Sequence, residues 1–180
     1  MHSATRRSWL GWFASAAVLA AGCARGVGGP GSSAPGDKGG GFSPAFTVSG
    51  AVHKPGTFDL AALQKLPATQ QTVGGNVYTG VSLWGLLEGG AGGIKPAGGR
   101  NPTVSMYAVA TGSDGYRAVL SMGEIDPGLS SRPAFVAYSL DGKPLDRNGM
   151  ARLVVPGDAK GSRSVANLAG IEVFTLPPQR

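Results

Sequence analysis

The sequence predicts an α+β domain in which short helices accompany a mixed, mostly antiparallel sheet. Two observations indicate this class: short runs of strand-forming residues are joined by tight-turn signals, and the helical segments between them are only one or two turns long. Glycine accounts for 31 and proline for 13 of the 180 residues, yet hydrophobic residues make up 42%. That share allows a packed core, so the chain is neither disordered nor collagen-like.

The domain is predicted to begin with a strand over residues 46–52 and a short helix. The turn at residues 53–56 contains Pro55 followed directly by Gly56. Asp59 can cap the helix and Pro67 ends it. One face of the helix carries three leucines, Leu60, Leu63 and Leu66.

A second strand is predicted over residues 70–77, broken by two glycines at 74 and 75, and a second helix follows it. Ser82 caps this helix, and Gly89 with Gly90 ends it. The side chains expected to be buried are Leu83, Trp84, Leu86 and Leu87.

The rest of the domain is predicted as hairpin-linked strands with two further helical turns. The strand over residues 103–111 turns at residues 112–115 into a strand over 116–120. Ser121 and Glu124 have the spacing of a capping box. The remaining elements are strands over 133–140, 152–156 and 171–176, and a last short helix capped by Ser164.

Composition excludes several classes of function. The single cysteine excludes a disulfide scaffold and a cysteine-rich zinc site, and the two histidines, His2 and His53, leave no histidine-rich metal site. The net charge of +6 comes from only 16 basic residues, which is too thin for a nucleic-acid binder. His53 is interpreted as a solvated turn residue, and no Gly-x-Ser-x-Gly elbow is present. We therefore assign no catalytic residue and no metal ligand.

The N-terminal residues are interpreted as an export signal, residues 1–22. Arg6 and Arg7 resemble a twin-arginine motif, and the apolar stretch at 9–21 is too short to span a bilayer. Small residues directly precede Cys23, as in a bacterial lipobox, so we expect Cys23 to carry lipid. A general secretion signal and an unmodified core cysteine are the alternatives.

A Gly/Ser/Pro-rich tether over residues 23–45 is expected to link this anchor to the domain at 46–180. The expected location is the cell envelope, on the periplasmic side and lipid-anchored to a membrane.

A basic loop follows the strand that ends at Pro156. Lys160 and Arg163 lie in this loop, and it leads into the helix start predicted at Ser164. Free backbone N–H groups and the positive end of the helix dipole favour an anion at such a place. An ordinary solvated connection remains an equal alternative.

An ordered series of short motifs in residues 46–180 resembles the sulfite-oxidase-type molybdopterin-binding domain, above all its small single-domain bacterial members. The resemblance implies an α+β fold that holds molybdopterin, with a cysteine thiolate on the molybdenum for oxygen-atom transfer. The motifs are Val52–Leu60, Leu63–Pro67, Tyr78–Leu87, Gly112–Tyr116, Leu120–Glu124, Ala137–Tyr138, Asp141–Leu145, Arg152–Gly157, Ser164–Val165 and Ile171–Val173.

The resemblance also implies a set of cofactor-binding residues, namely Thr111, Asn148, Arg152, Arg163, Ser164 and Val165. The sequence departs from the family's pattern at two places. Ala166 and Asn167 stand where the family has a basic and an aromatic residue. Residues 69–76, where the metal-binding cysteine belongs, contain no thiol. Thiolate is the soft ligand that molybdenum would need, whereas Thr72 or Asn76 would supply only a hard oxygen.

We therefore expect the domain to bind a small anionic or pterin-like ligand without molybdenum–thiolate catalysis. Arg152 and Arg163 would converge on the ligand's negative group, Thr111 and Asn148 would orient it, and a tyrosine, Tyr78 or Tyr116, would line the wall. Two alternatives stay open. One is a molybdenum-cofactor-dependent oxidoreductase without a cysteine ligand, and the other is a ligand-free surface lipoprotein that binds partners.

Overall fold

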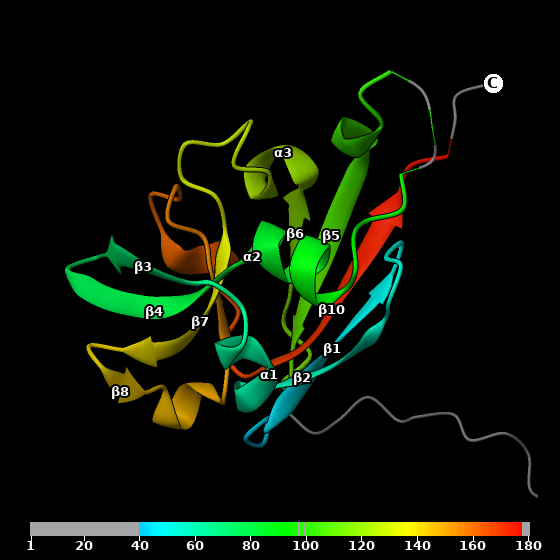
Figure 1. Ribbon diagram of the computed structural model, residues 1–180. Coiled ribbons are helices and arrows are strands. Elements are labelled where there is room, and N and C mark those ends of the chain that lie inside the picture. Colours follow the sequence, from blue (N-terminus) through cyan, green and yellow to red (C-terminus); the bar gives the residue numbers. More distant parts are fainter. Residues whose placement is uncertain (1–39, 97, 99, 178–180) are drawn as a thin grey trace, which may run out of the picture. The chain divides into compact units, whose positions relative to one another are not determined.

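The computed structural model describes residues 40–96, 98 and 100–177 (Figure 1). The predicted signal peptide, Cys23 and most of the predicted tether lie outside these residues. Within the described part of the chain, no helix is long and apolar enough to cross a membrane.

The first of two sheets contains both ends of the domain (Figure 1). Its neighbours are antiparallel except β1 and β10, which are parallel, with Thr47 opposite Gly170. In spatial order the strands are β2 (Gly56–Asp59), β1 (Ala45–Gly50), β10 (Leu168–Thr175), β5 (Met106–Gly112) and β6 (Arg117–Ser121).

The second sheet is antiparallel throughout. A bulge lies between Thr79 and Gly80, where β4 meets β7. In spatial order the strands are β3 (Ala68–Val73), β4 (Asn76–Ser82), β7 (Phe135–Leu140) and β8 (Lys143–Pro144), and β9 (Arg152–Val154) also pairs with β7.

The helices are short, and three of the four predicted caps are confirmed. The Asp59 side chain accepts from the Ala62 N–H at 2.8 Å, and Ser82 Oγ accepts from the Gly85 N–H at 2.8 Å. Ser121 and Glu124 form the capping box. The α-helices are α1 (Leu60–Gln64), α2 (Leu83–Gly85), which continues into the π-turn η1 (Leu86–Gly90), and α3 (Met122–Ile125). The 3₁₀ turns are η2 (Pro102–Ser105), η3 (Asp146–Asn148) and η4 (Gly161–Arg163).

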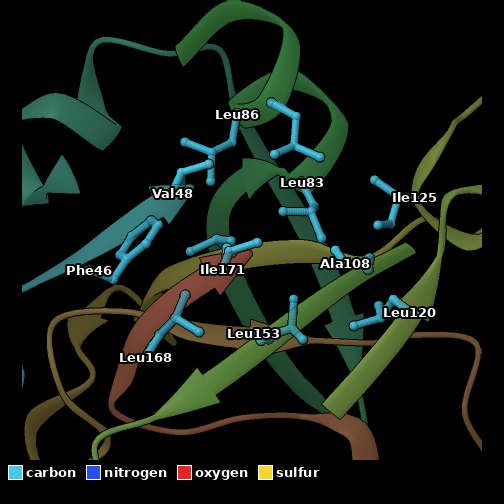
Figure 2. Close-up of a cluster of buried hydrophobic side chains, with 14 of the residues drawn as sticks. Phe46, Val48, Leu83, Leu86, Ala108, Leu120, Ile125, Leu153, Leu168 and Ile171 are labelled. Atoms are coloured by element: carbon cyan, nitrogen blue, oxygen red, sulfur yellow. The ribbon is translucent and has the colours of Figure 1, made fainter. Parts of the chain in front are cut away.

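The main core fills the space between the two sheets (Figure 2). Phe46 and Ile171 contribute from the first sheet and Leu153 from the second, each at most 1% exposed. A smaller satellite cluster lies on the opposite face of the second sheet and consists of Tyr78, Phe135, Ala137, Leu145 and Val154. The second sheet is therefore buried on both faces around β7 and β9.

Two sequence predictions of secondary structure are wrong in type. Residues 70–77 are not one broken strand but the β3–β4 hairpin, because Gly74 and Gly75 both have positive φ, at 61° and 84°, as a two-residue turn requires. Ser164 does not begin a helix. It follows the turn η4 in extended conformation, and Val165 exchanges two backbone hydrogen bonds with Leu153, at 2.9 and 3.1 Å.

Smaller differences concern boundaries and burial. Leu60 is 38% exposed and Trp84 only half-buried, because α1 and α2 are each too short to turn every apolar side chain toward the core. The strand predicted from residue 103 begins at Met106, because Pro102 opens the 3₁₀ turn η2. The end of the predicted tether contacts the domain: Ser113 Oγ donates to the Gly41 carbonyl and the Met150 N–H to the Ser43 carbonyl.

Candidate functional site

Arg163 is bound to two carboxylates. It lies in η4, where its Nε donates to Asp158 Oδ2 at 2.9 Å and its Nη2 donates to Asp158 Oδ1. Its Nη1 donates to Glu124 Oε1. The other oxygen of Glu124 accepts from the N–H and the hydroxyl of Ser121, both at 2.9 Å. Arg163 thus ties its loop to the start of α3.

These hydrogen bonds shift the pKa values of Arg163, Asp158 and Glu124. The hydrogen bonds to Asp158 and Glu124 raise the pKa of Arg163 further above its ordinary value. Arg163 in turn lowers the pKa of Asp158. Burial alone would raise the pKa of Glu124, but the hydrogen bonds from Arg163 and Ser121 outweigh it and hold that pKa below its usual range. Two carboxylates thus compensate one guanidinium, which leaves no net positive charge to attract an anion.

Arg152 has the opposite environment. It lies in β9 opposite Ala137. Because Leu153 points into the main core and strand side chains alternate, Arg152 lies on the face of the satellite cluster. The residue is half-buried, and its Nε is buried with no hydrogen-bond partner in the described part of the chain. A buried, unpartnered N–H on a cation is costly, so this position favours an acceptor.

The neighbours of Arg152 form one row across the second sheet. Thr69 pairs with Gly80, Gly80 with Ala137, and Ala137 with Arg152. Of these, Gly80 and Ala137 are buried and small. Aromatic side chains flank the row, with the Tyr78 and Phe135 rings edge-to-face at 6.5 Å between centroids. The surroundings of Arg152 are therefore largely apolar.

The structure does not bring the predicted binding residues together. Thr111 lies opposite Arg117 and Gly170 on the outer face of the first sheet, because its neighbour Ala110 points into the core. The core lies between Thr111 and Arg152. The expected convergence of Arg152, Arg163 and Thr111 is therefore not observed.

The other predicted binding residues differ in their position, burial and hydrogen bonding. Val165 is fully buried, and its backbone N–H and carbonyl are both bonded to Leu153. Ser164 is half-buried, and Asn148 lies in η3. Of the two expected wall residues, Tyr78 belongs to the satellite cluster, whereas Tyr116 is 48% exposed and donates to the Ser162 carbonyl.

Sequence reasoning missed Asn167. Its backbone is left-handed, with φ of 47°, and its Nδ2 donates to the Arg147 carbonyl at 3.1 Å. Its Oδ1 is buried without a partner in the described part of the chain. Gly149 is packed against it, since a Cβ at residue 149 would lie 2.4 Å from Asn167 Oδ1. The tolerance of asparagine for positive φ was the only available sequence signal.

These donors do not fit the molybdenum cofactor that the resemblance implies. Residues 69–76 form the β3–β4 hairpin and carry no sulfur. Among the described residues, no three histidine, cysteine, aspartate or glutamate side chains lie together so as to hold a metal. The helix start expected to meet a phosphate is absent at Ser164, and Arg163 is already paired with Asp158 and Glu124.

Three surface hollows lie away from Arg152 and Arg163. One of about 380 Å³ is lined by residues 101–104 with Asp126, Gly128 and Leu129. A second, of about 240 Å³, lies beside Phe42, Leu60 and Met150, and a third, of about 260 Å³, beside Gln64 and Pro144. None of the three is lined by a cation, so none resembles an anion site.

No family model and no curated protein matches this sequence. Among solved structures, the domain is similar to the sulfane dehydrogenase SoxCD from Paracoccus pantotrophus, with a TM-score of 0.57 and 22% sequence identity. The match covers 72% of this chain but only 38% of that one, so this chain spans well under half of that protein. The likeness concerns the fold, and it confirms the predicted fold class, a mixed α+β domain.

Proposed function

We propose that this chain is an envelope lipoprotein, anchored on the periplasmic side of a membrane through Cys23. Its domain of molybdopterin-enzyme type binds a small anionic or pterin-like ligand through Arg152 and does not carry out molybdenum–thiolate catalysis. The observation that carries the proposal is the buried Nε of Arg152, which has no partner among the described residues and lies on a largely apolar face.

Electrostatics supports Arg152 over Arg163 as the anchor. An anion near Arg163 would meet the negative charges of Asp158 and Glu124 as well. An anion at Arg152 would instead supply the missing acceptor in an environment of low polarity, where a charge-assisted hydrogen bond is stronger. Tyr78 and Phe135 on the same face suit a flat ring beside the charge.

Thermal unfolding in the presence of inorganic phosphate tests the binding. The purified lipoprotein in detergent is compared with two variants, Arg152→Met, which keeps the aliphatic stem, and Arg117→Met, which removes an exposed cation from β6. At ten times Kd, phosphate should stabilise the wild type and Arg117→Met by about 1.4 kcal/mol. Arg152→Met should show none of this gain.

Two outcomes would overturn the proposal. An equal rise in Tm for all three proteins would mean that phosphate acts only as a stabilising salt. Stoichiometric molybdenum in protein purified from a cofactor-producing host would instead favour the redox alternative.

A further inference from the structure

The edge strand β3 lacks the features that normally prevent a sheet edge from pairing with another chain. It is six residues long, has no proline, and lies within residues 66–87, a stretch without any charged side chain. Natural edge strands are usually short, charged, interrupted by proline or covered. In Figure 1, β3 lies at the free border of the second sheet.

The other edge strands in the described part of the chain each carry such a feature. β8 has two residues, one of them Pro144. β2 has four residues, the last of them the charged Asp59. β9 has three residues, and Leu153 is bonded to Val165. β6 carries Arg117, and the neighbouring Tyr116 hydroxyl is bonded to the loop at Ser162. The open edge of β3 is therefore exceptional within this domain.

Hairpin geometry indicates which backbone groups of β3 are free. A two-residue turn is closed by a hydrogen-bonded pair, here Val73 with Asn76, and such pairs alternate along an antiparallel ladder. Val73, Gln71 and Thr69 therefore direct their N–H and carbonyl groups toward β4. The other three residues, Ala68, Gln70 and Thr72, direct theirs outward, and their side chains are exposed. In the described part of the chain, no backbone group outside β4 bonds to β3.

We propose that β3 pairs antiparallel with β3 of a second copy of this chain, around a two-fold axis through Gln70. This register brings the outward-facing residues of the two strands opposite one another, Gln70 to its counterpart and Ala68 to Thr72 of the other copy. It satisfies the free groups of all three residues in both chains.

The side chains of β3 favour a second copy as the occupant. A two-fold pairing brings together two strands of identical charge, so a strand with a net charge would repel its copy, whereas β3 is neutral. On the face shared with Arg152, the register places Thr69 opposite Gln71 of the other copy, a polar pair able to hydrogen-bond. The second sheet would thereby continue from one copy into the next.

Disulfide trapping in isolated membranes tests both the pairing and its register. In Gln70→Cys the two Cα atoms would lie about 5.5 Å apart, within disulfide range. In Thr72→Cys, the matched control on the same strand, the two residues are offset by four positions, or about 14 Å, which is out of range. Copper phenanthroline should therefore convert Gln70→Cys to a dimer on a non-reducing gel and leave Thr72→Cys and the wild type monomeric.

A charge pair provides the second measurement. Gln70→Lys and Gln70→Glu should each be monomeric in native mass spectrometry. The Tm of the monomer should change little, because residue 70 is exposed and gives up only one exposed hydrogen bond, from its Nε2 to Thr79 Oγ1. Mixing the two variants should restore a dimer that contains one copy of each. Three results would each overturn the proposal: cross-linking of Thr72→Cys as readily as Gln70→Cys, trapping only to proteins of other mass, or a wild type that is monomeric in native mass spectrometry.

Discussion

Arg152 and Arg163 lie eleven residues apart in the chain, and both were expected to bind one anion. The structure gives them opposite environments. All three nitrogens of the Arg163 guanidinium donate to Asp158 or Glu124, whereas Arg152 has a buried Nε without an acceptor. A positive charge in a sequence is thus no measure of the charge that a ligand would meet, because long-range contacts decide which cations are already compensated.

The largest expected effect comes from adding a side chain at Gly80, in the same row as Arg152. A Cβ at residue 80 would lie 2.1 Å from the Val136 carbonyl oxygen and 2.6 Å from the Ala137 Cα, so β4 and β7 would have to move apart. We expect Gly80→Ala to lower the free energy of unfolding by about 3 kcal/mol, measured by urea denaturation.

Gly157→Ala is the matched control in the loop of Arg163, since a Cβ there would meet no atom within 4 Å. Its free energy of unfolding should equal that of the wild type. If both variants lost the same free energy of unfolding, the packing around Gly80 would be no tighter than the packing around Gly157.

A smaller effect is expected from removing Arg163 itself. Arg163→Met leaves Asp158 and Glu124 without their partner and should cost about 1 kcal/mol of unfolding free energy, a modest value because water screens side chains that are 37% exposed at Arg163 and Glu124. Arg152→Met removes an unpartnered donor and should cost nothing in the absence of ligand. A larger loss for Arg152→Met than for Arg163→Met would reverse the comparison.

The smallest effect concerns acid pH. Asp158 and Glu124 have lowered pKa values in the folded protein, so their contribution to stability is complete above the unfolded pKa of about 4 and is lost as the pH falls through the lowered values. The wild type and Arg163→Met should therefore converge in unfolding free energy below about pH 3. A gap that stays constant from pH 6 to pH 2.5 would exclude this origin.

Local signals in the sequence predicted much of the fold. Asp59, Ser82 and Glu124 act as caps within one turn of their own position, so their roles depend on neighbouring residues alone. The resemblance in ordered motifs also led to the correct fold class, although no single motif is specific.

Long-range pairing explains what the sequence did not reveal. Serine is a residue type that favours helix N-caps, as predicted at Ser164. However, Val165 bonds to Leu153, twelve residues earlier, and this pairing holds the chain extended. Arg163 reaches Glu124 across 39 residues, and Thr111 points away from Arg152 because its strand belongs to the other sheet. Local sequence patterns therefore could not predict that Arg152 and Arg163 lie in different environments.

The parallel pairing of β1 with β10 has a consequence for biosynthesis. The last strand of the chain occupies the middle of the first sheet, with β1 and β2 on one side and β5 and β6 on the other. While a ribosome still holds residues 168–175, the two halves of that sheet have nothing to join them. The native state becomes accessible only after residues 168–175 have left the ribosome, and a chain truncated before Leu168 would expose the apolar surfaces of both halves.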